Sequence, residues 1–169
     1  MDIISTQNPR IKFLVKLRDR RVREREGLML VEGAYEVEVA LKSGLTPQTV
    51  YLSPELAGEK VPIGTTAEIL TVSIPVFEKI SYRDNPDGWL AVFPIPRRDF
   101  NDIKVGPNLF VLAVEAVEKP GNLGAILRTA DSAGVDAILV CDPKADLFNH
   151  NVVRASRGTV FTVPAVQTT

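Results

Sequence analysis

Hydrophobic and polar positions alternate along this chain with two periods, which predict strands and helices in turn. Short apolar runs bounded by turn residues are typical of buried strands, whereas apolar residues three or four positions apart are typical of the buried side of a helix. We expect strands at 28–31, 49–52, 68–72, 89–93, 109–115, 137–141 and 161–166. We expect helices at 9–26, 33–43, 75–80, 122–133 and 152–157. Because strands and helices alternate, the pattern favours an α/β fold, with a parallel sheet in the second half of the chain.

The pattern is interrupted at 94–99, where two prolines and three charged residues stand within six positions. Such a composition is typical of an exposed connection. We therefore predict a first domain at 1–95, a linker at 96–106 and a second domain at 107–169. The second domain has only three expected strands, which is few for a parallel sheet buried on both faces. The sequence thus indicates that this second domain is incomplete.

The composition is that of an ordinary globular protein. Of the 169 residues, 45% are hydrophobic, which is enough for a buried core, and 24% are charged. No run of 18 apolar residues predicts a membrane span, and the first residues lack the basic and apolar segments of a secretory signal. Cys141 is the only cysteine, so we expect no internal disulfide, no cysteine-bound metal and a location in the reducing cytoplasm.

Positive charge is concentrated at the N-terminal end of the chain. Residues 1–27 carry eight Lys or Arg against four Asp or Glu, whereas the formal net charge of the whole chain is −1. A local excess of basic residues can bind the phosphates of a structured RNA. A solvated helix face with internal ion pairs, such as Arg20 with Glu24, explains the same residues equally well.

The most informative segment is 118–134, which follows an apolar run expected to form a strand. It begins with turn residues, among them Pro120 and Gly121, and continues with helix-forming residues that include Arg128. The spacing of Gly121 and Gly124 fits neither a dinucleotide fingerprint nor a phosphate-binding Walker loop. Taken alone, these glycines indicate a tight turn between a strand and a helix, and a surface or salt-bridged position explains Arg128.

Two segments taken together resemble the motifs of a known family. The segment 122–130 reads Asn-Leu-Gly-Ala-Ile-Leu-Arg-Thr-Ala, and the segment 153–158 reads Val-Arg-Ala-Ser-Arg-Gly. They are similar to the first and second motifs of the SpoU/TrmH family of RNA ribose 2′-O-methyltransferases, which is part of the SPOUT superfamily. Segments 8–12, 17–23 and 31–33 are similar to the substrate-binding domain of that family. The resemblance covers nearly the whole chain.

The resemblance implies a fold, a reaction and partners. It implies a ribosomal-protein-like α/β domain for substrate RNA, followed by the first part of a parallel-sheet methyltransferase domain of the trefoil-knot type, a rare exception among folds. The implied reaction transfers a methyl group from S-adenosylmethionine (AdoMet) to a ribose 2′-hydroxyl in ribosomal or transfer RNA. The implied partners are structured RNA and a second copy of the chain, with no membrane.

The resemblance also implies roles for particular residues. Arg128 matches the catalytic arginine, whose guanidinium can stabilise the alkoxide form of the 2′-hydroxyl. Asn122 matches a residue of the same site. Arg154 and Ser156 match the second motif, where phosphate binding is expected, although a helix cap explains Ser156 equally well. Further RNA contacts are expected from basic residues of the first domain, namely Arg10, Lys12, Arg18, Arg20, Arg21 and Arg23.

The sequence departs from the pattern of the family in one respect. Family members continue with a strand ending in Gly-Asn-Glu, an Ile-Pro segment and a helix containing Ser-Leu-Asn-Val, and none of these occurs in the 169 residues. Those segments form most of the cofactor pocket of the family, so we assign no cofactor-binding residue. The alternative function is therefore a non-catalytic RNA-binding protein that keeps a remnant of the second domain. An in-frame continuation of the gene that encodes these segments would favour the enzyme.

We therefore predict that the 169-residue polypeptide by itself neither binds AdoMet well nor methylates RNA. Isothermal titration calorimetry of the purified chain with AdoMet is expected to show no saturable heat in the micromolar range. A dissociation constant in that range would refute the prediction, because it would mean that the pocket forms without the third motif.

Overall fold

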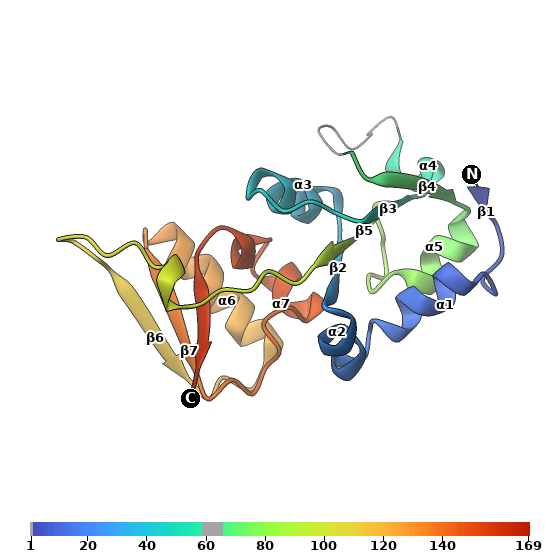
Figure 1. The fold of residues 1–169 in the computed structure, drawn as a ribbon. Helices are drawn as coiled ribbons and strands as arrows, with labels where there is room; N and C mark the ends of the chain where they lie inside the picture. The colour runs from blue at the N-terminus through green and yellow to red at the C-terminus, as the bar shows by residue number, and fades with distance from the viewer. Residues whose placement is uncertain (1, 59–65) are drawn as a thin grey trace. The chain divides into compact units, whose positions relative to one another are not determined.

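The computed structural model describes residues 2–58 and 66–169, which fall into two compact units, Met1–Ile95 and Pro96–Thr169 (Figure 1). The first unit contains β1 (Asp2–Ile3), α1 (Pro9–Lys16), α2 (Arg20–Glu26), β2 (Leu28–Glu32), α3 (Ala34–Lys42), β3 (Thr49–Leu52), α4 (Pro54–Ala57), β4 (Glu68–Val72), α5 (Ile74–Ile80) and β5 (Trp89–Pro94). The second unit contains η1 (Phe100–Asp102), β6 (Val111–Glu115), α6 (Pro120–Ser132), β7 (Ala137–Cys141), α7 (His150–Ala155), η2 (Thr159–Phe161) and β8 (Ala165–Thr168). Both units are therefore of the expected α/β class.

The sheet of the first unit has the strand order β1-β4-β3-β5-β2 and is mixed. β4 pairs in parallel with β1 and β3, whereas β5 runs antiparallel to both β3 and β2. Parallel pairing, which the sequence predicts for the second domain, thus accounts for only part of this sheet. The reason is the segment 81–88, which carries the chain from α5 to the carboxyl end of β3, where the Ser53 amide donates to the Gly88 carbonyl at 2.9 Å. From there β5 can only run back along β3.

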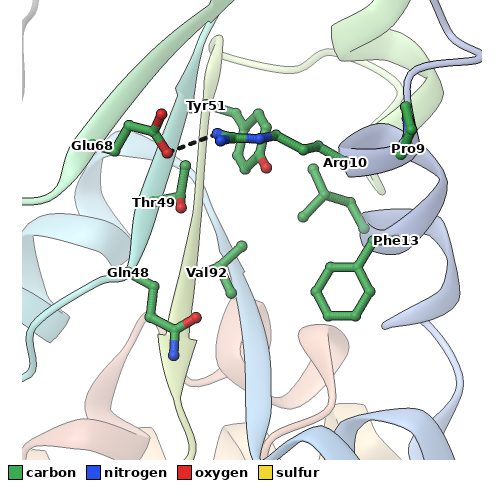
Figure 2. A pocket seen from close by; sticks show the side chains of 9 residues that line it. Pro9, Arg10, Phe13, Gln48, Thr49, Tyr51, Glu68 and Val92 are labelled. Carbon is green, nitrogen blue, oxygen red and sulfur yellow. Dashed lines mark hydrogen bonds and ion pairs between the residues drawn. The ribbon is translucent and has the colours of Figure 1, made fainter.

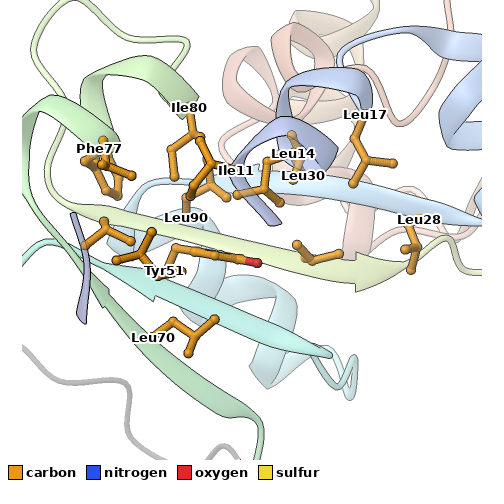
Figure 3. Close-up of a cluster of buried hydrophobic side chains, with 14 residues drawn as sticks. Ile11, Leu14, Leu17, Leu28, Leu30, Tyr51, Leu70, Phe77, Ile80 and Leu90 are labelled. Carbon is orange, nitrogen blue, oxygen red and sulfur yellow. The ribbon is translucent and has the colours of Figure 1, made fainter. Parts of the chain in front are cut away.

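Helices cover both faces of this sheet. Side chains alternate along a strand, so Leu28 and Leu30 of β2 point to the face covered by α1 and α5, while Met29 and Val31 point to the face of α3 (Figure 1). On the first face they join a cluster of buried side chains (Figure 3), made of Ile3, Ile11, Leu14, Leu17, Leu28, Leu30, Tyr51, Leu70, Val72, Val76, Phe77, Ile80, Leu90 and Val92. Burying one large apolar side chain contributes about 1.5–3 kcal/mol. The cluster therefore fixes α1 and α5 on the sheet.

The basic N-terminal segment forms two helices, α1 and α2, where the sequence pattern predicts one. The Asp19 carboxylate caps α2 by accepting from the Arg21 amide at 2.7 Å. The Arg23 guanidinium, only 2% exposed, donates to the carbonyls of Leu17 at 2.9 Å and Arg18 at 2.7 Å. These carbonyls follow the end of α1, where helix bonds are missing. The break is thus stabilised by a cap on one side and a buried cation on the other.

The sheet of the second unit has the order β6-β7-β8, and its strands are all parallel. α6 connects β6 to β7, and the segment with α7 and η2 connects β7 to β8. The strand predicted at 161–166 begins later than expected, at Ala165. Gly158 adopts a left-handed conformation with φ of 80° and starts the turn η2, and Pro164 has no amide to offer a neighbouring strand. Both features delay the strand.

The segment 96–106, expected to be a linker, lies within the second unit. It contains the turn η1, which begins with a reciprocal cap between Asp99 and Asp102. The half-buried Arg98 guanidinium donates to the Phe161 carbonyl at 2.7 Å. Burial lowers the pKa of Arg98, and the Asp102 carboxylate acts in the opposite direction. The hydrogen bond fastens the start of this unit to the end of η2.

α6 and α7 pack against each other at Gly124. A Cβ atom added to Gly124 would lie 2.5 Å from the Cβ of Ala155, 2.8 Å from the Val152 carbonyl oxygen and 2.9 Å from the Ser156 amide nitrogen. Atoms of this kind do not approach so closely, so only glycine permits the observed distance between the two helices.

We predict that Gly124→Ala destabilises the second unit by about 1–3 kcal/mol, because the added methyl group forces the α7 backbone to move. Gly121→Ala is the matched control, since no atom lies within 4 Å of a Cβ at Gly121 and alanine is the better helix former. Native-state hydrogen exchange of the β7 amides is expected to accelerate in the first variant only. Equal protection in both variants would contradict the assigned role of Gly124.

We also predict that Arg23→Met lowers the unfolding free energy of the first unit by about 2–4 kcal/mol, because two backbone carbonyls lose their donors. Trp89 is the only tryptophan in the chain and is 5% exposed in β5, so its fluorescence during urea unfolding reports on this unit. The control is Arg21→Met, an exposed position on the same helix, which should change the value by less than about 0.5 kcal/mol. Similar losses in both variants would argue against the buried role of Arg23.

Candidate functional site

The two helices that meet at Gly124 carry the residues of both sequence motifs. Asn122 lies in the first turn of α6, and Arg128 lies one turn beyond Gly124 on the same helix. Arg154 lies on α7, next to the Ala155 side chain that abuts Gly124. All three of these predicted site residues are exposed. The two motif segments, about 30 positions apart in the sequence, thus lie on two helices that are in contact.

The Arg128 and Arg154 side chains have no hydrogen-bond or ion-pair partner within residues 2–58 and 66–169, which the structure describes. A guanidinium without a carboxylate partner keeps its charge and its five donors for a ligand. Its planar fork matches a phosphate, and its charge favours an oxyanion. These two arginines can therefore bind an anionic ligand or stabilise a developing negative charge.

Ser156, by contrast, takes a structural position. Its side chain is fully buried, and its hydroxyl donates to the Val153 carbonyl at 3.0 Å. Asn149 supplies the cap of α7, because its side-chain oxygen accepts from the Asn151 amide at 2.8 Å. We therefore do not propose Ser156 as a phosphate-binding residue.

The carboxyl edge of the second sheet has a strained backbone that the sequence pattern does not reveal. Ala116 and Asp142 directly follow β6 and β7 and adopt left-handed conformations, with φ of 50° and 44°. The Ala116 amide donates to the Cys141 carbonyl at 3.0 Å, so the two strand ends are tied together. Ligands of open parallel sheets bind at the carboxyl ends of the strands, and strained non-glycine residues concentrate at functional sites. Only a backbone conformation, not a residue type, marks these positions.

The basic residues of the first unit divide by their contacts. Lys12, Arg21, Arg10 and Arg20 are all exposed. Arg10 forms an ion pair with Glu68 at 2.7 Å, and Arg20 forms one with Glu24 at 2.6 Å. The Arg20 pair is the internal helix pair that the sequence suggests. Such exposed pairs contribute little to stability and can exchange partners with a ligand.

Arg18 and Arg23 have structural positions in the same region. The Arg18 guanidinium donates to the carbonyls of Lys79 and Ser81, both at 2.9 Å, and lies 4.8 Å from the centre of the Tyr82 ring. It thereby fastens α1 to the end of α5. Burial raises the pKa of the Tyr82 hydroxyl to about 12, although the positive charge of Arg18 acts to lower it. We therefore do not propose Arg18 or the buried Arg23 as RNA-binding residues.

Two other kinds of site can be tested against the same residues. Within the described part of the chain, no three or more His, Cys, Asp or Glu side chains gather in a way that could hold a metal ion. Nor does any helix of that part have the length and apolar character needed to cross a membrane. The exposed arginines of the two motif helices remain the strongest candidate site.

Comparisons with known families match both units. The MRM3-like substrate binding domain matches residues 8–91, and the SpoU rRNA Methylase family matches residues 109–169. Among curated relatives, the Bacillus subtilis 23S rRNA (guanosine(2553)-2′-O)-methyltransferase RlmP is 32% identical over 98% of this chain and 64% of its own length.

Solved structures give the same result. A crystal structure of an RNA 2′-O ribose methyltransferase is 37% identical, with a TM-score of 0.85, over 100% of this chain and 66% of that chain. The AdoMet-bound rRNA methyltransferase of Sinorhizobium meliloti is 29% identical, with a TM-score of 0.86, over 99% of this chain and 64% of that chain. This chain thus spans 64–66% of the length of these three relatives. The matched motifs, the two family models and the shared fold show that the chain belongs to the SpoU rRNA methylase family.

Proposed function

We propose that the protein is a methyltransferase that uses AdoMet to methylate a ribose 2′-hydroxyl in ribosomal or transfer RNA. The observation that carries the proposal is the contact of the two motif helices at Gly124. It places Arg128 and Arg154, whose side chains have no partner among the described residues, on one pair of helices. The names of the relatives support the reaction class, because the RlmP relative is a 23S rRNA 2′-O-methyltransferase. The name of the solved S. meliloti relative supports AdoMet as the cofactor.

Arg128 is the proposed catalytic residue. A ribose hydroxyl is a poor nucleophile while it is protonated, and a nearby guanidinium stabilises the alkoxide that forms as the proton leaves. When bound, AdoMet supplies an electrophilic methyl group on a sulfonium. Asn122 lies about 1.7 turns before Arg128 on α6 and offers an amide that can orient the ribose or the loop. Arg154 holds an adjacent phosphate of the RNA.

We assign no described residue to AdoMet itself. The turns at Ala116 and Asp142 lie at the sheet edge where ligands of parallel sheets bind, and they offer backbone groups rather than charged side chains. For the 169-residue polypeptide alone we therefore propose RNA binding without efficient methyl transfer. The first unit supplies the RNA surface, through the exposed Lys12 and Arg21, through Arg20 after it exchanges its carboxylate partner, and through Arg10 while it stays paired with Glu68. We propose a homodimer as the active assembly.

The test of this function is methyl transfer by the protein expressed from its complete gene, with radiolabelled AdoMet and unmodified ribosomal and transfer RNA as substrates. Arg128→Ala is expected to lower kcat by about 100- to 1000-fold, the usual effect of removing one group that stabilises an oxyanion. Arg97→Ala is the matched control, because Arg97 is an exposed arginine of the same unit outside both motifs. Equal activity of the two variants would remove Arg128 from catalysis. Absence of methyl transfer by the unsubstituted protein to either RNA would refute the function.

A further inference from the structure

The first unit contains a hollow of about 390 Å³ that the proposed reaction does not use (Figure 2). It lies between the first turns of α1 and the beginnings of β3 and β4. Its volume falls within the range of small-ligand sites in proteins, about 300–1,000 Å³. The lining residues that carry the argument are Arg10, Phe13, Thr49, Tyr51 and Glu68, with Gln48 at the rim.

The hollow is a continuation of the core face of the sheet. Tyr51 and Leu70 pair across β3 and β4 and belong to the buried cluster under α1 and α5. Thr49 and Glu68 form the next pair that points to this face, and neither belongs to the cluster. The core-facing side of the sheet therefore continues past the apolar cluster with polar residues.

The lining combines apolar surfaces with hydrogen-bonding groups. The partly buried Phe13 contributes an aromatic ring, and Tyr51 and Val92 are buried at 4% exposure each. Figure 2 shows the Arg10 and Glu68 side chains along one side of the hollow and Phe13 and Gln48 along the other. A flat ligand could thus contact rings and aliphatic groups with its faces and polar groups with its edges.

The polar groups of the hollow carry no net charge. The Arg10 Nη1 atom lies 2.7 Å from the Glu68 Oε2 atom, and both side chains are 51% exposed. The Glu68 carboxylate raises the pKa of Arg10. A neutral pair disfavours a phosphate, but it offers donors and acceptors side by side, as the edge of a nucleobase requires. The exposed Lys12 also lies on α1 but on a side of the helix that faces away from Arg10, so it can contact the phosphate of a neighbouring nucleotide.

We propose that this hollow binds one unpaired nucleobase of the RNA that the protein recognises. Proteins bind single-stranded RNA by stacking bases on aromatic side chains beside a basic surface, and an unpaired base has both its face and its edge available. Phe13 supplies the stacking surface, and Glu68, Arg10 and the Gln48 amide read the edge. The proposal rests on the proposed binding of RNA by the first unit.

The test compares two probes on the 169-residue chain by fluorescence anisotropy. One probe is a single-stranded nine-nucleotide RNA of mixed sequence, and the other has the same backbone with every base removed. The proposal expects the RNA with bases to bind about 5- to 100-fold more tightly, the effect of one stacked base. It expects the affinity of both probes to fall as the salt concentration rises, because both contact the basic surface through phosphates.

Matched variants locate the difference between the two probes. Phe13→Leu removes the ring but keeps an apolar side chain, and Glu68→Gln removes the edge-reading carboxylate. Phe13→Leu is expected to reduce the affinity ratio of the two probes to nearly one, and Glu68→Gln is expected to lower the ratio while the stacking on Phe13 remains. Glu38→Gln is the control for Glu68→Gln, because Glu38 is also an exposed carboxylate, 2.7 Å from Lys42 on α3, and the charge change is the same. Its ratio is expected to stay unchanged. A loss of folding would weaken the binding of both probes, so the ratio is compared only for variants that bind the probe without bases as tightly as the unsubstituted chain does.

The outcomes separate this proposal from the proposed function. If neither probe binds, RNA binding by the first unit fails, and the nucleobase site fails with it. If both probes bind equally, or if the ratio persists in Phe13→Leu and Glu68→Gln, the nucleobase site alone fails. AMP, CMP, GMP and UMP form the last arm, as competitors against the RNA with bases. Displacement of the RNA only by millimolar mononucleotide supports an RNA base as the occupant of the hollow. A mononucleotide that binds as tightly as the RNA would overturn the proposal and indicate a free nucleotide as the occupant.

Discussion

The close contact of α6 and α7 at Gly124 is the constraint on which the second unit depends. With no side chain at this position, the α7 backbone approaches α6 to a distance that even a methyl group would prevent. The two helices follow neighbouring parallel strands, so each begins from the carboxyl edge of the same sheet. The contact then fixes the direction of α7 relative to α6. The positions of Arg128 and Arg154 are thus set by packing in the protein interior rather than by contacts of the arginines themselves.

In the first unit, the arginines between positions 18 and 23 make different contacts although they lie close together in the sequence. Arg18 and Arg23 donate to backbone carbonyls at helix ends, so they stabilise the break between α1 and α2 and the end of α5. Arg21 stays exposed beside them. A buried guanidinium is tolerated only when its donors are satisfied, and carbonyls at helix ends are suitable acceptors. Arg18 and Arg23 thus stabilise the helices on which the exposed basic residues lie.

The sequence predicted most elements, because their apolar periods are set by the core that they form. Strands 49–52, 68–72 and 137–141 were predicted with the bounds that the structure shows. The break at Asp19 was missed because basic residues continue across it with helical character, and only the capping geometry ends α1. The direction of β5 could not be predicted, because periodicity does not encode strand direction. The motif residues Asn122, Arg128 and Arg154 could be located, whereas burial of Ser156 and Arg23 depends on tertiary contacts that no local pattern contains.

The two candidate sites need opposite electrostatics. Phosphate contacts give RNA affinity but carry no sequence information, so a site that distinguishes nucleotides must contact the bases. An unpaired arginine in the hollow of the first unit would bind any phosphate, and Glu68 removes that possibility by neutralising Arg10 while adding an acceptor. Methyl transfer needs the reverse, because the charge of Arg128 must stay uncompensated until the 2′-hydroxyl loses its proton. A carboxylate beside the arginine is therefore useful in the proposed nucleobase site and would be harmful at the proposed catalytic site. Among the described residues, Arg10 has an acidic partner and Arg128 has none, as the two proposals require.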